Sequence, residues 1–403
     1  MSKFGIAFLL LALRINKHIR GYIDFYFGPK KLRKIVHKES IISPSKLLTD
    51  CITLQEKLFM QGFNKAREKY LEKILIAMRT SIEILNGVEI PFKTEFLRQF
   101  DVTLQPVDES KLENLKEELN EAYPGSGSLE ERMAKLRVQR KVPEAEVFEL
   151  FQKAVNITKK RTKELFVDLL PKREKIILQL VKNNKNEVKW SFYEWYLGHF
   201  RSRIEINPNF GMFWSSFLSS AAHEGYPGHH TEFIVKEQRL YHELNQFEHS
   251  LLLIHSPKLI ISEGIAELAV NMLFDYREQA EISLREFCPD SLKEDSIEVI
   301  IGQNKVKEKL NLFLYNFSYH ALVDEWSEED LIRYGTNFEI YSKEIISNQI
   351  KMLSSPAFSK NLFMYNIGNN IILHKYGKLP STNNFRDLLV NPILPSDLVK
   401  NYY

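Results

Sequence analysis

Cysteine is almost absent from this sequence. Among 403 residues only Cys51 and Cys288 occur, and they form no C-x-x-C pair. This scarcity argues against a disulfide framework and against a cysteine-based zinc site. It favours a reducing compartment, which we expect to be the cytoplasm. Any metal site must then be built from histidine and carboxylate side chains.

A large excess of one charge is also missing. The chain has 55 basic and 52 acidic residues, which gives a net charge of +3. So mild a balance provides no electrostatic reason to expect nucleic acid or an anionic membrane as a partner. The hydrophobic content of 44% is that of a protein that buries a core.

No apolar run is long enough to span a bilayer. The strongest candidate is FGIAFLLLAL at 4–13, which ends at Arg14. Only Lys3 precedes it and no small-x-small cleavage site follows, so a signal peptide is poorly supported. We expect a buried N-terminal helix that continues through 12–28, and we keep a membrane anchor as a weaker alternative.

Helical periodicity dominates the first part of the chain. Apolar residues recur at three- and four-residue spacing over 65–85, and Gly87 follows as a helix end. Ser128 and Glu131 form the S-x-x-E pattern of a helix start. A further long helical stretch covers 143–171 and begins with a proline.

Strand patterns are few. The best are KIILQLV at 175–181 and HFRSRIEI at 199–206, which carry bulky and alternating residues. We therefore predict a mainly α-helical fold with a small β-sheet beside the motif described next. The interpretation is a single compact chain, 1–403, with a tentative helical half at 1–170 and a half at 171–403 that carries the chemistry.

An unusual motif, HEGYPGHH, occupies residues 223–230. A familiar zinc-peptidase helix reads H-E-x-x-H, but here Pro227 stands at the position of the second histidine. On a straight helix His229 would lie about 600° round from His223 and would face away from it. His230 would return to the same side, but roughly 10 Å along the axis. Neither could share a metal with His223 without a bend.

The residues between the histidines can supply that bend. Pro227 removes a helical hydrogen bond, and its ring collides with the carbonyl of His223. Gly225 and Gly228 flank it and can adopt conformations that other residues avoid. The motif is therefore compatible with a metal site on a kinked helix, and equally with a histidine-rich surface loop.

Carboxylates complete the candidate site. Glu224 follows the first histidine, where it can take a proton from a water activated by the metal. LIISEGIAELAV at 259–270 is an apolar, helix-like stretch that carries Glu263 and Glu267 one turn apart. Carboxylates in such a run need a partner, and a metal ion is one such partner. For Glu267 a partly exposed helix carboxylate is the simpler interpretation.

These residues resemble a large bacterial and archaeal family, the domain of unknown function 885. Its members carry an H-E-x-x-P-G-H-H core and are grouped with the zinc metallopeptidases whose third ligand is a glutamate, the gluzincins. The core lies within 206–232 here, and SEGIAELA at 262–269 is similar to the family's E-G-W-A-x-x-x-E segment. Weaker similarities occur, in the same order, at 21–29, 322–335 and 363–370.

The resemblance implies a gluzincin-type helical architecture and a set of roles. It assigns one zinc per chain to His223, His229 and Glu263, with Glu224 as general base. His230 would then contact a ligand or the substrate rather than the metal. Tyr365, in the later Y-x-x-G, would donate a hydrogen bond to a developing oxyanion, or would simply be a packed aromatic.

The chain also departs from the family pattern. Ile265 stands where the family usually has tryptophan, and near 315–325 the sequence lacks the arginine and aspartate that many members carry before their equivalent region. Arg203 and Arg277 are candidate clamps for a peptide carboxylate, although surface or salt-bridging roles are the simpler interpretation. The remaining histidines, such as His242, His249, His255 and His320, are interpreted as ordinary surface or core residues.

The functional hypothesis is a zinc-dependent hydrolase, most simply a metallopeptidase that acts on short peptides. The alternative is a non-catalytic protein with a structural zinc. In that case His230 would be a fourth ligand that closes the site. The strand at 199–206 precedes the motif, where related peptidases pair an extended substrate with a sheet edge.

Overall fold

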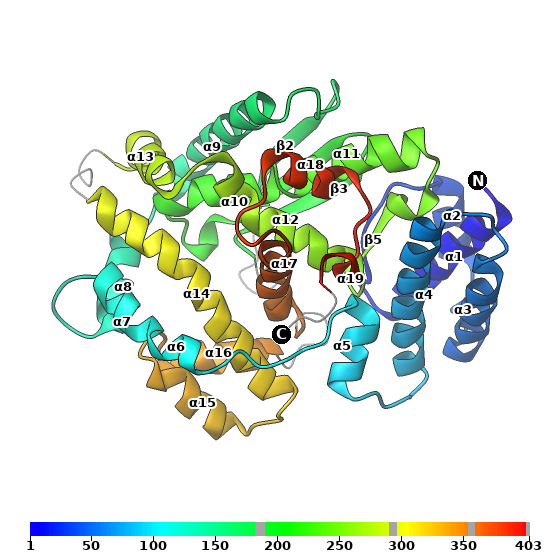
Figure 1. Ribbon diagram of the computed structural model, residues 1–403, viewed down its shortest axis with the longest axis horizontal. Coiled ribbons are helices and arrows are strands. Elements are labelled where there is room, and N and C mark those ends of the chain that lie inside the picture. The colour runs from blue at the N-terminus through cyan, green and yellow to red at the C-terminus, as the bar shows by residue number, and fades with distance from the viewer. Residues whose placement is uncertain (182–189, 290–295, 354–358, 400–403) are drawn as a thin grey trace.

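The computed structural model describes residues 1–181, 190–289, 296–353 and 359–399. These residues form a mainly helical body that contains two small sheets (Figure 1). The α-helices are α1 (Lys3–His18), α2 (Lys30–Lys38), α3 (Pro44–Leu58), α4 (Lys65–Leu85), α5 (Phe92–Phe100), α6 (Ser110–Glu113), α7 (Leu115–Ala122), α8 (Leu129–Arg140), α9 (Glu144–Leu165), α10 (Phe217–Glu224), α11 (His229–Lys236), α12 (Pro257–Leu273), α13 (Tyr276–Glu286), α14 (Ile297–Leu322), α15 (Glu328–Asn337), α16 (Lys343–Leu353), α17 (Asn361–Tyr376), α18 (Thr382–Val390) and α19 (Pro395–Leu398). The strands are β1 (Ile23–Tyr26), β2 (Lys175–Leu180), β3 (Phe192–Gly198), β4 (Arg201–Ile206) and β5 (Leu251–Leu253). The mainly α prediction is confirmed.

Local signals in the sequence set several helix ends. The helix predicted at 65–85 is α4, which Asn64 caps through the backbone N–H of Arg67. Ser128 begins α8 with a complete capping box. The stretch that begins at Pro143 is α9, but it ends at Leu165 and not at residue 171.

The N-terminal helix is shorter than predicted. It buries its apolar face, including Phe8 and Leu9, but it ends at His18. The continuation through 12–28 is therefore wrong: Ile19 already leaves the helix with extended backbone, and Gly21 follows with a left-handed φ of 83°. The chain then becomes strand β1, which pairs antiparallel with the distant β5. None of the described helices has both the length and the hydropathy to cross a bilayer.

The larger sheet has the order β2-β4-β3. Strands β2 and β4 match the two predicted strand segments and run parallel to each other, whereas β3 was not predicted and pairs antiparallel with β4. Because β4 lies between the other two, it has no free edge. Both β3 and β4 contact α11, so the sheet does lie beside the motif helix.

Helix α12 crosses the centre of the molecule (Figure 1). It is apolar on nearly all sides, as a fully buried helix should be. Helices α10 and α17 pack against it, and α17 approaches so closely that Gly264 and Gly368 meet backbone to backbone. The largest hydrophobic cluster around α12 draws side chains from both sides of residue 170, so the two tentative halves share a core.

Candidate metal centre

The HEGYPGHH motif is a break between two helices. Helix α10 ends at Glu224 and α11 begins at His229, with a cis Tyr226–Pro227 peptide in the connection. The N–H of Gly228 donates to the carbonyl of Ala222 at 2.9 Å, which tightens the bend. A Cβ atom on Gly228 would lie 2.0 Å from the carbonyl oxygen of His223, so glycine is required there. The chain therefore has the bend between His223 and His229 that the sequence allows.

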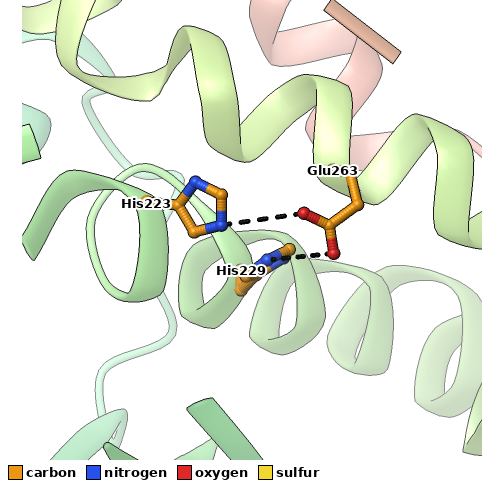
Figure 2. Close-up of side chains that lie close together, drawn as sticks. All are labelled: His223, His229 and Glu263. Atoms are coloured by element: carbon orange, nitrogen blue, oxygen red, sulfur yellow. Dashed lines mark ion pairs between the residues drawn. The ribbon is translucent and has the colours of Figure 1, made fainter. Parts of the chain in front are cut away.

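This bend brings three side chains together from two sides (Figure 2). His223 Nε2 lies 3.7 Å from Glu263 Oε2, and His229 Nε2 lies 3.7 Å from Glu263 Oε1. The ligand atoms of all three residues lie within 4.8 Å of one another, and no other metal-binding group of three is found among the described residues.

These distances fit a small cation better than hydrogen bonds. At 3.7 Å the N···O separations exceed a hydrogen bond. Ligands about 2.05 Å from a tetrahedral zinc ion would lie about 3.4 Å apart. The two 3.7 Å separations are close to that value, and the whole group, which lies within 4.8 Å, would draw in slightly around an ion. Glu263 Oε2 is also buried without a hydrogen-bond partner in the described structure. The residues present therefore fit a zinc ion.

The electrostatics agree with that fit. Burial lowers the pKa of His223 well below its usual value, and it lowers the pKa of His229 to about 4. Both imidazoles are therefore neutral near pH 7, the form that binds a metal. Burial, followed by the charges of Glu224 and Glu267, raises the pKa of Glu263 well above its usual range. A divalent cation at this point would relieve that crowding of negative charge.

Each histidine also contacts a group behind it. His223 Nδ1 lies 3.4 Å from Glu267 Oε1, and His229 Nδ1 lies 3.2 Å from Ser262 Oγ. Such contacts orient an imidazole and select which nitrogen faces the metal. The sequence pointed to Glu267 only as a carboxylate one turn from Glu263. It did not point to Ser262, whose one signal was its position next to Glu263.

Glu224 and Tyr365 border the cluster. Burial raises the pKa of the Glu224 carboxyl to about 8, against a hydrogen bond from the backbone of Glu194 in β3 that lowers it. The Tyr365 ring centre is 6.3 Å from that of His223, and 36% of the residue is exposed. The charge of Glu263, with burial second, raises the pKa of Tyr365 well above its usual value, so its hydroxyl remains a donor.

The second histidine of the pair turns the other way. His230 is fully buried, with Nδ1 2.6 Å from Ser202 Oγ and Nε2 3.2 Å from Glu174 Oε2. Glu174 also accepts a hydrogen bond from Tyr226 and pairs with Lys159. His230 is therefore an anchor between α11 and the sheet, and the structure does not bring it to the cluster.

The two arginines considered as clamps also lie elsewhere. Arg203 pairs with Glu205 on the same strand at 3.0 Å and lies over the Trp195 ring. Arg277 pairs with Glu298 on the surface. These partners match the simpler interpretation of both residues as salt-bridging side chains.

Four further histidines lie outside the group formed by His223, His229 and Glu263. His242 contacts Glu237 at 3.1 Å, and His320 contacts both Asp324 and Glu109. His249 and His255 are buried. None of the four belongs to the metal-binding group.

Comparison with known proteins gives a fold without an activity. No protein-family model and no curated protein matches the chain. Among solved structures, "the putative lipoprotein from Colwellia psychrerythraea" is similar, with a TM-score of 0.54 and 12% identity over 92% of this chain and 68% of that one. A second, "a putative lipoprotein of unknown function from Shewanella oneidensis", has a TM-score of 0.48 and 11% identity, over 91% of this chain and 74% of that one. At such identity the first likeness concerns the fold alone.

Proposed function

We propose that this chain is a zinc-dependent hydrolase of the gluzincin type, which acts on short peptides. The observation that carries the proposal is the group formed by His223, His229 and Glu263. Two neutral imidazoles and a carboxylate place their ligand atoms within 4.8 Å of one another, and one buried carboxylate oxygen lacks a hydrogen-bond partner there. Three protein ligands leave one position for water or substrate, as in catalytic zinc sites.

A zinc ion at this point would polarise the scissile carbonyl and make a bound water acidic. The protein's own residues would do the rest. Glu224 follows His223 directly, and a divalent cation beside it would lower the raised pKa of its carboxyl. The carboxylate would then accept a proton from the attacking water and deliver it to the leaving amine. Tyr365 has a hydroxyl that stays protonated, so it can donate a hydrogen bond to the developing oxyanion.

The sheet suggests how an extended substrate would bind. The predicted strand at 199–206 is β4, which has neighbours on both sides and cannot pair with a peptide. Strand β3 is an outer strand, and the backbone of Glu194 in it reaches Glu224. A peptide that added to β3 would therefore run past the proposed base. This placement supports peptides as the substrate class.

The test is Glu224→Gln, which keeps the size and reach of the side chain but cannot accept a proton near neutral pH. We expect zinc content and fold to be retained while turnover falls at least about a hundredfold, because a general base contributes roughly 10²–10⁴-fold. Glu205→Gln is the matched control, since Glu205 pairs with Arg203 away from the cluster. Full activity of Glu224→Gln on a peptide that the parent hydrolyses would remove Glu224 from the mechanism.

A structural zinc remains the alternative hypothesis, with His230 as fourth ligand. The geometry disfavours it, because both ring nitrogens of His230 already contact Ser202 and Glu174. The absorption spectrum of cobalt-substituted protein distinguishes the two. An open site should change its spectrum when a small anion binds, whereas a closed four-ligand site should not.

A further inference from the structure

Behind the proposed ligand His229 lies a line of buried polar groups. Ser262 Oγ, 3.2 Å from His229 Nδ1, donates to Glu232 Oε2 at 2.6 Å. Glu232 Oε1 in turn accepts from Lys236 Nζ at 2.6 Å. All three of Ser262, Glu232 and Lys236 are less than 5% exposed. The line therefore runs from α11 to α12 and back to α11 through the protein interior.

The hydrogen atoms available along this line determine which ring nitrogen of His229 is protonated. A serine hydroxyl has a single hydrogen. Its short contact with Glu232, which is paired to Lys236, is a charge-assisted bond and takes that hydrogen. Ser262 can then only accept from His229, so Nδ1 must carry the ring proton. The lone pair of His229 is left on Nε2, which faces Glu263 Oε1.

We propose that Ser262 and Glu232 are positioning residues that hold His229 in its metal-binding tautomer. The inference rests on the proposed function in one respect, that the cluster binds zinc. Ser262 precedes the ligand Glu263 on α12, and Glu232 lies one turn beyond His229 on α11. The same pair of residues thus links the two helices that contribute the second and third ligands. The line also places a negative charge behind the imidazole, which strengthens Nε2 as a donor to a metal.

The experiment compares zinc affinities by competition with a chromophoric chelator. Loss of such an outer contact costs about 10–100-fold in metal affinity, so we expect that range for Ser262→Ala. Glu232→Gln keeps the shape but removes the charge, and we expect roughly tenfold weaker binding. Ser318→Ala is the matched control: Ser318 is equally buried and donates to Leu314 within α14, so its loss should leave zinc affinity unchanged.

A second measurement needs no zinc. Nitrogen NMR of metal-free protein with ¹⁵N-labelled histidine reports which ring nitrogen of His229 carries the proton, with the signal assigned from His229→Gln. A proton on Nδ1 in the parent, lost from that position in Ser262→Ala, supports the proposal. A proton on Nε2 in the parent, or parent-like zinc affinity in both Ser262→Ala and Glu232→Gln, overturns it.

These outcomes separate the inference from the proposed function. If the parent binds zinc but hydrolyses nothing, the hydrolase proposal fails. The zinc affinities of the variants still decide whether Ser262 and Glu232 position His229. If the parent binds no zinc, the proposed function fails, and the tautomer of His229 alone decides whether Ser262 acts as described.

Discussion

The contact between Gly264 and Gly368 provides the sharpest test of how the fold builds the site. Gly264 follows the proposed ligand Glu263 on α12, and Gly368 lies three residues after Tyr365 on α17. A Cβ atom on Gly264 would lie 2.5 Å from both the carbonyl carbon and the oxygen of Gly368. Carbon atoms pack at about 3.5–4.0 Å, so Gly264→Ala must move the helices apart by about 1 Å or more.

The magnitude follows from two opposing effects. Alanine is better than glycine inside a helix by about 1 kcal/mol. Overpacking in a dense core costs about 1–3 kcal/mol, and the upper end applies here because backbone atoms cannot rotate out of the way. We therefore expect Gly264→Ala to lower the free energy of unfolding by about 2 kcal/mol.

Gly302 provides the matched control. It lies within α14, and a Cβ atom there would be 3.8 Å from Ala122, which is an ordinary contact. Gly302→Ala should therefore stabilise the protein by about 1 kcal/mol through helix propensity alone. The two variants should differ by about 3 kcal/mol in urea unfolding, which for a chain of this size is a difference of roughly 3–4 °C in Tm.

Separation of α12 from α17 should also disturb the site. Glu263 and Tyr365 lie on these two helices, so Gly264→Ala should weaken zinc binding, whereas Gly302→Ala should not. If Gly264→Ala is as stable as Gly302→Ala and binds zinc as tightly as the parent, then α12 and α17 do not approach each other as closely as the structure indicates.

Three further outcomes are expected. His230→Ala should lose about 1–3 kcal/mol of stability, because Glu174 loses a buried partner, yet zinc affinity should remain within about tenfold of the parent's; a structural four-ligand site would lose the metal outright. Gly228→Ala should give protein that binds no zinc, measured by elemental analysis, because its Cβ would meet the carbonyl oxygen of His223 at 2.0 Å. Burial lowers the pKa of His255 from 6.5 to about 3. The folded protein therefore has its full stability above pH 6.5 with respect to this residue, and it loses stability as the pH falls from 6.5 toward 3. Urea unfolding should show that the parent loses about 2 kcal/mol more stability between pH 7 and pH 5 than His255→Phe does, because the other buried histidines titrate alike in both proteins.

The helices could be predicted where the signal is local. The helix at 65–85 and the start at Ser128 follow from periodicity and capping, which act within a few residues. Strand β1 could not be predicted in the same way, because its partner β5 is more than two hundred residues away. The alternation in β3 is disguised by aromatic side chains on both faces of the strand, including Tyr193 and Tyr196.

The outer residues of the site show the same limit. His223, Glu224 and Glu263 stand in patterns that chemistry makes unusual, since a carboxylate in an apolar helix and a histidine beside Pro-Gly both need a reason. Ser262 and Glu232 do not, because a serine or a glutamate in a helix is ordinary in sequence. Their role becomes visible only in the folded structure, where α11 packs against α12 and the hydroxyl of Ser262 contacts both His229 and Glu232.

The choice between the two adjacent histidines depends on direction. Neighbouring residues on a helix point about 100° apart, so His229 and His230 cannot both reach one point. Which one faces α12 depends on how α11 leaves the bend, and that is fixed by packing against the sheet. Ser202 and Glu174 hold His230 on the sheet side, and this contact turns His229 toward Glu263. The two adjacent histidines of the motif therefore have different roles: His229 faces the proposed metal, and His230 anchors α11 to the sheet.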